Sequence, residues 1–312
     1  DMKGLTAYKG HAVFENSGTV RVGDELLHAE RIFINVGGRA YIPDIPGLDT
    51  AGFLTNSDMV NLNTVPDHLV IIGGSYVGLE FAQMFRRFGS RVTVVERNSR
   101  IIGREDPEVS EALLDILRQE DITIRLEAEC IGVEKHGEAI SVQTACKENP
   151  SQIEGTHLLI AAGRQPNTED LGLEKAGVAT DKRGYISVNE RLETNVAGIW
   201  ALGDCNGKGA FTHTSYNDYQ IAAANLLENE DRRVSDRIPC YCLYTDPPLG
   251  RAGMTEQQVR KAGYNALTGK LPMKRVGRAR GKGETSGFMK IIVNADTEKI
   301  LGAAVLGVEG DE

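Results

Sequence analysis

The order of apolar and polar residues predicts that strands alternate with helices in this chain. Residues 68–80 read HLVIIGGSYVGLE, in which four consecutive apolar residues, Leu69 to Ile72, run into a glycine turn. A continuous apolar run of this length is typical of a strand that is buried on both faces of a parallel sheet. After the turn, apolar residues recur near helical spacing and predict one apolar helix face: Val77, Phe81, Met84 and Phe88, with Phe85 beside them. Gly89 is placed to end that helix, and SRVTVVER (90–97) predicts a second strand.

The glycine turn is compatible with two chemistries, and its spacing separates them. A nucleophile elbow needs the pattern G-x-S-x-G, but the fifth residue counted from Gly73 is Val77. The dinucleotide pattern G-x-G-x-x-G fits at Gly73 and Gly78, with Ser75 in the place of the middle glycine. The helix N-terminus then offers free N–H groups to a pyrophosphate. We therefore predict that residues 73–78 bind a dinucleotide: Gly73, Gly74, Ser75, Tyr76, Val77 and Gly78.

The end of the second strand carries the residues that would choose between the two nicotinamide cofactors. Glu96 follows the turn at about the spacing at which an acidic residue binds the 2′-hydroxyl of the NAD ribose. Arg97 and Arg100 come next, and arginines at such a position could bind the 2′-phosphate of NADP. We favour NAD, and NADP stays open.

A second nucleotide signature follows later in the chain, in TNVAGIWALGD (194–204). Its apolar residues predict a short buried strand, and Asp204 comes just after Gly203 at the predicted end of that strand. Doubly wound sheets bind ligands at this edge, where a carboxylate can accept hydrogen bonds from sugar-like hydroxyl groups. The simpler alternative is an aspartate that caps the following turn.

Four motifs occur in one order: NVGGRAYIPDIPG (35–47), the glycine turn, LLIAAGRQPN (158–167) and TNVAGIWALGD. In this order the chain resembles the flavoprotein pyridine nucleotide-disulfide oxidoreductases, which include mercuric reductase, dihydrolipoamide dehydrogenase and glutathione reductase. The resemblance implies an α/β fold with Rossmann-like, three-layer FAD- and NAD(P)-binding domains, followed by the start of an α+β interface domain that forms a homodimer. The implied segments are FAD domain 1–60, NAD(P) domain 61–163, FAD domain 164–236 and interface domain 237–312.

The resemblance also implies roles for individual residues. Asp204 would bind the ribityl chain of FAD, Tyr76 would be the aromatic gate over the flavin, and Glu80 would pair with a lysine beside it. Gly163 and Arg164 would approach the cofactors. Phe211 and Thr212, in AFTHTSYND (210–218), would lie where a loop and the start of a helix face the pyrimidine end of the flavin. For Tyr76 and Glu80 the alternatives are an ordinary packed aromatic ring and a solvated helix charge.

Several parts of the family pattern do not occur in this sequence. The FAD-binding glycine fingerprint, the redox motif C-x-x-x-x-C and the closing His-Pro…Glu motif are not found among the 312 residues. We therefore expect a central fragment of a longer enzyme. A hydride would pass from NAD(P)H to the flavin, and electrons would pass on to a disulfide, a metal ion such as Hg(II) or a small oxidant. GREDPEVSEALLDIL and FTHTSYND resemble mercuric-reductase-like members most.

Two other functions remain open at this point. One is a flavin-dependent NAD(P)H oxidase or ferredoxin reductase of related fold, which needs no cysteine pair. The other is a dinucleotide-binding redox sensor without catalytic activity.

Composition and charge argue against several classes of binding partner and site. The formal net charge of −9 argues against nucleic acid and anionic membranes as partners, and we expect the basic stretch 274–283 to be a solvated loop. No apolar run approaches the length of a membrane span. Five cysteines without C-x-x-C spacing or an export signal indicate a reducing cytoplasm. The six scattered histidines give no metal-site spacing, so we expect no metal site.

Overall fold

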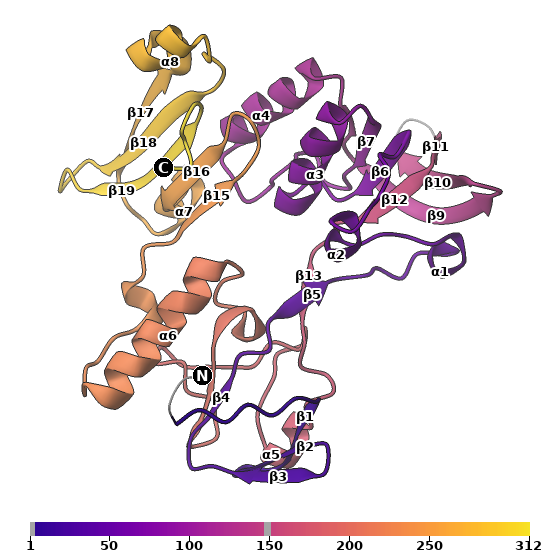
Figure 1. Cartoon of the computed structure of the whole chain (residues 1–312). Helices are drawn as coiled ribbons and strands as arrows, with labels where there is room; N and C mark the ends of the chain where they lie inside the picture. The colour runs from indigo at the N-terminus through magenta and orange to yellow at the C-terminus, as the bar shows by residue number, and fades with distance from the viewer. Residues whose placement is uncertain (1–3, 147–150) are drawn as a thin grey trace. The chain divides into compact units, whose positions relative to one another are not determined.

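The structure is a computed structural model that describes residues 4–146 and 151–312. It contains two compact units, each built from two stretches of the chain. Unit 1 comprises residues 1–39 and 164–237, and unit 2 comprises residues 40–163 and 238–312. Within the described residues, no helix is both long enough and apolar enough to cross a bilayer. Figure 1 follows the chain through its helices and strands.

Unit 1 contains short sheets and one long helix. An antiparallel sheet has the order β1-β2-β3, while β4 pairs in parallel with β14 and β5 pairs with β13. The apolar core of the unit includes Phe14, Ile34, Ile186, Ile199 and Cys205. The elements are β1 (Ala12–Asn16), β2 (Thr19–Val22), β3 (Glu25–His28), β4 (Ile32–Ile34), β5 (Gly38–Ala40), β13 (Arg164–Pro166), α5 (Leu173–Ala176), β14 (Ile199–Ala201), η1 (Gly203–Asn206), α6 (Thr212–Leu227) and η2 (Val234–Asp236).

Unit 2 begins with the predicted doubly wound segment. The strands of its four-stranded sheet are all parallel and have the order β12-β6-β7-β8. Every residue of β6 is buried, which confirms the strand predicted from the apolar run. A separate antiparallel sheet contains β9, β10 and β11. The elements are α1 (Leu48–Ala51), α2 (Asn56–Met59), β6 (His68–Ile72), α3 (Tyr76–Arg87), β7 (Arg91–Val95), α4 (Pro107–Gln119), β8 (Thr123–Arg125), β9 (Ala128–His136), β10 (Ala139–Cys146), β11 (Ser151–Gly155) and β12 (His157–Ile160).

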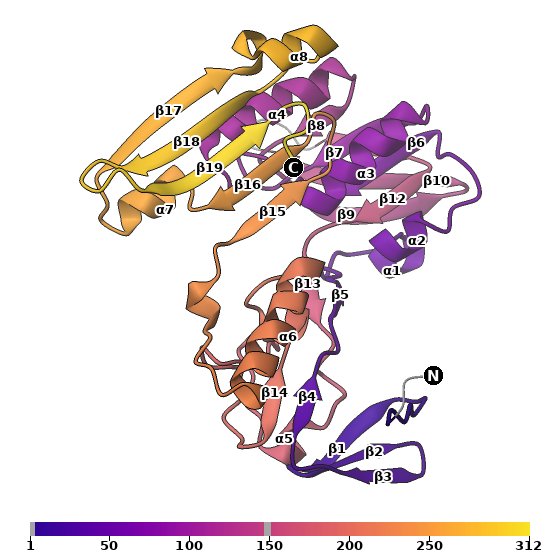
Figure 2. The same ribbon diagram turned by 60° about the vertical axis from the view of Figure 1, so that its left-hand side comes forward.

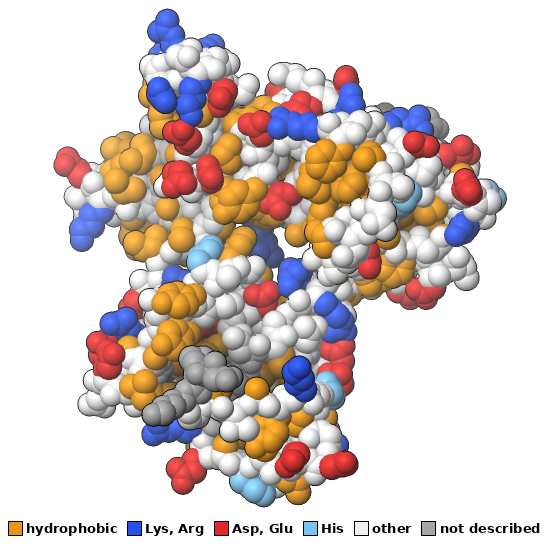
Figure 3. Space-filling model, viewed as in Figure 1, with side chains coloured by type: hydrophobic (Ala, Val, Ile, Leu, Met, Phe, Trp, Pro, Cys, Tyr) orange, Lys and Arg blue, Asp and Glu red, His pale blue; other side chains and the backbone are white. Residues whose placement is uncertain are grey.

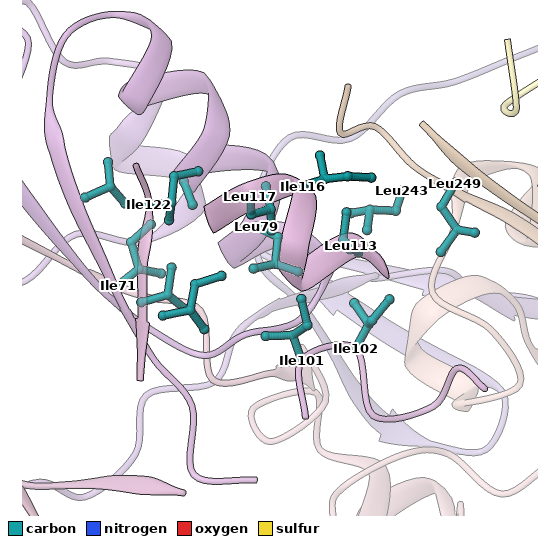
Figure 4. Close-up of a cluster of buried hydrophobic side chains, with 14 of the residues drawn as sticks. Ile71, Leu79, Ile101, Ile102, Leu113, Ile116, Leu117, Ile122, Leu243 and Leu249 are labelled. Atoms are coloured by element: carbon teal, nitrogen blue, oxygen red, sulfur yellow. The ribbon is translucent and has the colours of Figure 1, made fainter. Parts of the chain in front are cut away.

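The rest of unit 2 is a five-stranded antiparallel sheet with the order β15-β16-β19-β18-β17. Figure 2 shows α4 against one face of this sheet. Leu113 and Leu117 of α4 belong to the same buried cluster as Leu243 and Leu249 of the sheet, and Figure 4 labels all four. One apolar core therefore joins the two segments of unit 2. The elements are β15 (Cys240–Leu243), β16 (Leu249–Gly253), α7 (Glu256–Lys261), β17 (Ala266–Pro272), η3 (Met273–Arg275), α8 (Gly277–Lys282), β18 (Phe288–Asn294) and β19 (Ile300–Leu306).

Two local predictions were wrong in part. On α3, Phe85 is buried and Phe81 packs half-buried against the core, as predicted, but Met84 and Phe88 are exposed, and Leu79 and Ala82 are buried in their place. The basic stretch 274–283 is not a simple loop: it contains η3 and the short helix α8, which buries Ala279 and ends at Gly283 with a φ of 75°. Basic side chains gather over α8 on the molecular surface (Figure 3), so the prediction that they are solvated agrees with the structure.

Candidate functional site

The glycine turn between β6 and α3 brings backbone into very close contact. Gly73 has a φ of 117°, and a Cβ atom there would lie 2.3 Å from the carbonyl oxygen of Ala161. A Cβ at Gly78 would lie 2.1 Å from the carbonyl oxygen of Gly73. Both positions therefore require glycine, which lets the helix start directly against the strand. This is the packing that a dinucleotide-binding turn needs.

The helix that follows starts at the edge where a phosphate would bind. Ser75 is the exposed N-cap residue of α3, and its side chain makes no capping hydrogen bond within the described residues. Val77 is half-buried in the first turn of the helix. The first N–H groups of an α-helix have no partner within the helix, so the chemistry of this turn suits an anion. The residues present therefore fit the pyrophosphate of a nicotinamide dinucleotide.

Glu96 lies beside the turn and also supports it. One carboxylate oxygen accepts a hydrogen bond from the backbone N–H of Gly74 at 2.7 Å, and the other accepts one from the N–H of Asn98 at 2.8 Å. The side-chain amide of Asn98 also donates to the second oxygen, at 2.5 Å. Since an ionised carboxylate can accept about four hydrogen bonds, a ribose hydroxyl could still be bound. Arg97 is exposed next to Glu96.

Tyr76 and Glu80 both contact the second segment of unit 2. The Tyr76 hydroxyl lies 3.4 Å from Oε1 of Glu105, and its ring packs edge-on against Tyr241 of β15. Glu80 accepts a hydrogen bond from the backbone N–H of Tyr244 at 2.9 Å, and burial raises the pKa of its carboxyl group. The lysine partner that the resemblance implied for Glu80 is not among its contacts within the described residues.

The predicted flavin-binding residues of unit 1 form a second, separate group. Gly203 has a φ of 71°, and a Cβ there would lie 2.7 Å from Oγ of Ser215. The turn therefore packs tightly as it presents Asp204. Arg164 donates a hydrogen bond to the Asp204 carboxylate at 3.2 Å and another to the carbonyl oxygen of Gly38 at 2.6 Å. An oriented carboxylate and guanidinium suit the hydroxyl and phosphate groups of a dinucleotide.

The remaining predicted positions lie at the starts and ends of elements. Gly163 has a φ of 131° and is the last residue of the first stretch of unit 2. Phe211 is the N-cap residue of α6, Thr212 is its first residue, and the Phe211 ring stacks on His213. The structure thus places Gly73–Gly78 with Glu96 in unit 2, and Arg164, Gly203, Asp204, Phe211 and Thr212 in unit 1. Within the described residues, no group of three His, Cys, Asp or Glu side chains could hold a metal ion.

Asp218 supports the Gly203 turn, and sequence reasoning assigned it no role. Its side chain is fully buried on α6 and ion-paired with Arg237. One oxygen accepts hydrogen bonds from the backbone N–H of Gly203 at 2.8 Å and from the side chain of Asn206 at 2.9 Å. A buried carboxylate that holds a backbone N–H fixes the loop to which that group belongs. The sequence around Asp218, SYNDYQ (215–220), is polar and gives no local signal for this role.

We expect Asp218→Asn to lower the free energy of unfolding by about 3 kcal/mol, because Arg237 would lose its buried countercharge. The substitution would also bring an amide group close to the N–H of Gly203. Urea unfolding would measure the loss, and hydrogen exchange at the Gly203 amide would locate it. Asp231→Asn is the matched control. The Asp231 carboxylate pairs with the arginines Arg191 and Arg233 but is exposed, so its substitution should cost less than about 1 kcal/mol of stability. Equal losses in the two variants would contradict the assignment.

Comparisons with known proteins agree with this geometry. Residues 2–224 match the family described as pyridine nucleotide-disulphide oxidoreductase, and residues 239–312 match the dimerisation domain of that family. The chain is 39% identical over 319 residues to the probable pyridine nucleotide-disulfide oxidoreductase RclA of Escherichia coli, covering 100% of this chain and 71% of that protein. It is 33% identical over 303 residues to the mercuric reductase of Staphylococcus aureus, covering 97% of this chain and 55% of that relative.

A solved structure is similar along nearly the whole chain. The Cu(II) complex of the HOCl-induced flavoprotein disulfide reductase RclA from Escherichia coli superposes with a TM-score of 0.90 at 39% identity, and it covers 97% of this chain and 69% of that one. The chain thus spans about two-thirds of the length of this relative and about half the length of the mercuric reductase.

Proposed function

The chain belongs to the pyridine nucleotide-disulfide oxidoreductase family, and from that premise we propose that it binds NADH beside FAD and serves hydride transfer between them. The observation that carries the proposal is the turn at Gly73 and Gly78. A Cβ atom added at either residue would lie only 2.3 or 2.1 Å from a backbone carbonyl oxygen, so each position has room for glycine alone. FAD, when bound, supplies the acceptor for the two electrons of the hydride. In this proposal the helix N-terminus of α3 binds the pyrophosphate of NADH, and Asp204 binds the flavin ribityl chain.

The proposal includes a preference for NAD over NADP. Glu96 is buried, and its carboxylate is fixed by Gly74 and Asn98 at the end of β7. A fixed carboxylate accepts the 2′-hydroxyl of a ribose and repels a 2′-phosphate. Arg97 is exposed and could turn toward such a phosphate, so the preference rests on Glu96.

The electron acceptor in this proposal is a disulfide or a metal ion. The similarity to mercuric reductases at 33% identity or more supports a metal ion such as Hg(II), and the similarity to RclA, named a flavoprotein disulfide reductase, supports a disulfide. The match of residues 239–312 to a dimerisation domain supports a homodimer. A reducing cytoplasm is the proposed compartment, because five cysteines without C-x-x-C spacing suit reduced thiols.

The test is a visible absorption spectrum of the chain with FAD, followed by anaerobic addition of NADH or NADPH. We expect the flavin band to bleach, and to bleach faster with NADH.

Glu96→Gln keeps the size of the side chain and removes its charge, so the preference for NADH should fall by about tenfold, or about 1.4 kcal/mol. Glu111→Gln, on the exposed side of α4, is the control. A flavin that neither cofactor reduces would refute the function, and an unchanged preference in Glu96→Gln would refute the role of Glu96. Oxidation of NADH with an added dye as electron acceptor would indicate an enzyme, and NADH binding without oxidation would indicate a redox sensor.

A further inference from the structure

Strand β15, from the second segment of unit 2, contacts Tyr76, the first helical residue after the glycine turn. The ring centroids of Tyr76 and Tyr241 are 5.6 Å apart, and the rings are nearly perpendicular at 89°. The hydroxyl groups of both tyrosines point to the same carboxylate oxygen, Oε1 of Glu105. Tyr76 is the first residue of α3, whereas Tyr241 belongs to β15. One carboxylate therefore joins the cofactor turn to the five-stranded sheet.

Glu105 is itself held in place by a buried ion pair. Its second oxygen, Oε2, accepts a hydrogen bond from Nε of Arg251 at 3.1 Å and a shorter one from the Nη2 group. Both side chains have an exposed fraction of 0%. A buried carboxylate needs such a countercharge. Arg251 lies on β16, so the sheet supplies both the second tyrosine and the cation.

The backbone that carries Glu105 is also tied to the glycine turn. The N–H of Ile102 donates to the carbonyl oxygen of Gly74 at 2.8 Å, and the N–H of Glu105 donates to the carbonyl oxygen of Ile102 at 2.8 Å. Ile102 is buried, so this short connection is not free to move independently of the core. Glu105 is thus connected to the glycine turn twice, through its backbone by way of Ile102 and through its carboxylate by way of Tyr76.

The protonation of the two phenols suits this arrangement. Burial, followed by the nearby Glu105, raises the pKa of Tyr241 to about 12. Burial, with Tyr241 and Glu105 next in effect, raises the pKa of Tyr76. Both groups therefore remain hydrogen-bond donors to the carboxylate at neutral pH.

We propose that Glu105 and Tyr241 are positioning residues for Tyr76, which hold its ring toward the sheet and thereby set how that ring meets a nicotinamide dinucleotide bound at the turn. The part of this proposal that concerns the bound dinucleotide rests on the proposed function, whereas the positioning of the Tyr76 ring does not. The dimerisation-domain segment then contributes to the cofactor site of its own chain, in addition to any contact with a second copy. Substitutions of Tyr241 should act on cofactor binding through Tyr76.

The position of Tyr76 can be tested without cofactor, by fluorine NMR of the whole chain labelled with 3-fluorotyrosine. Tyr76→Phe identifies the signal. We expect this signal to stay unshifted over the pH range around 10 in which free tyrosine ionises, and to move and titrate at lower pH in Tyr241→Phe. Tyr264→Phe removes an exposed hydroxyl group elsewhere in the same segment and should leave the signal as it is. A Tyr76 signal that titrates as free tyrosine does, or that is unchanged in Tyr241→Phe, would overturn the proposal.

The effect on the cofactor can be tested with a double-mutant cycle on NADH affinity. We expect Tyr241→Phe to change the Kd by about 3- to 10-fold in the wild-type background and by less than about 2-fold in the Tyr76→Phe background, because coupled residues are non-additive. Additive effects would overturn the positioning role. If the wild-type chain binds no NADH, the proposed function fails by itself, and the fluorine signal still decides whether Tyr76 is held. Tyr241→Phe is preferred to Glu105→Gln, which would remove one of the two buried carboxylates that Arg251 contacts and would destabilise the chain.

Discussion

Replacing Arg251 by methionine is expected to lower the free energy of unfolding by about 3–5 kcal/mol. Arg251 is fully buried and contacts two buried carboxylates, Glu105 and Asp106, at Nε–Oε2 and Nη2–Oδ2 distances of 3.1 and 3.3 Å. Methionine fills much of the same volume but carries no charge. Both carboxylates would lose a countercharge, although Lys290 would still contact Asp106 at 3.1 Å. Urea unfolding at neutral pH would measure the loss.

Arg260→Met is the matched control for this prediction. Arg260 also contacts a carboxylate, that of Glu256 at 2.6 Å, but its side chain is 63% exposed. A surface pair at this helical spacing contributes about 0.3–0.5 kcal/mol. The triple substitution Arg251→Met, Glu105→Gln and Asp106→Asn should recover part of the loss, because no buried charge would then lack a partner. A loss in Arg251→Met no larger than the loss in Arg260→Met would show that the buried ion pair does not stabilise unit 2.

A second large effect is expected for Gly78→Ala, which should weaken NADH binding by at least about tenfold, or about 1.4 kcal/mol. The new Cβ would lie 2.1 Å from the carbonyl oxygen of Gly73, and the clash is with backbone. The start of α3 would have to move away from β6, which would displace the N–H groups aimed at the pyrophosphate. Overpacking of this kind also costs about 1–3 kcal/mol of stability. Fluorescence titration with NADH and urea unfolding would measure the two effects.

Gly103→Ala is the control for the glycine turn. Gly103 is exposed and follows Ile102, whose N–H donates to the carbonyl oxygen of Gly74 in the turn. A Cβ at Gly103 would meet nothing within 4 Å. Its effect on stability should stay within about 0.5 kcal/mol, with NADH affinity unchanged. If Gly78→Ala bound NADH as the wild type does, the turn would not be the pyrophosphate site.

The sequence was sufficient to predict those parts of the fold that depend on local pattern. The buried strand β6, the glycine turn and the parallel sheet follow from a continuous apolar run and from glycines at fixed spacing. The stretch MTEQQVRKAG (254–263) likewise indicates a helix with a threonine N-cap and a glycine after its end. In the structure, Thr255 accepts a hydrogen bond from the N–H of Gln258 at 3.2 Å at the start of α7.

The buried face of α3 could not be predicted in this way. Gln83 looks like a surface residue in the sequence, but it is buried because its side chain donates to Glu120 at 2.7 Å and to the carbonyl oxygen of Asp246 at 2.8 Å. Those partners are 37 and 163 residues away in the chain. Phe88 was expected on the apolar face and is 59% exposed. Tertiary contacts, not helical spacing, decided which side of this helix became the core.

The charged residues of unit 2 show the same limit more strongly. Glu105, Arg251 and Lys290 each resemble a solvated surface charge when the sequence is read locally. Their burial depends on pairings across 146 residues for Arg251 with Glu105 and 184 residues for Lys290 with Asp106. The resemblance to a family indicated that Tyr76 and Glu80 matter, but it gave no reason to connect either of them to residues 241–244. Direct contacts of α3 with β15 and with Tyr244 just after it make that connection.

The core shared by α4 and the five-stranded sheet limits how the dinucleotide-binding segment can be divided or transplanted. Residues 40–163, moved alone into another protein, would expose Leu113 and Leu117 and would keep Glu105 and Asp106 without Arg251 and Lys290. Recombination that preserves function should therefore exchange residues 40–163 together with 238–312. Residues 164–237 separate these two stretches in sequence but belong to the other unit, together with residues 1–39.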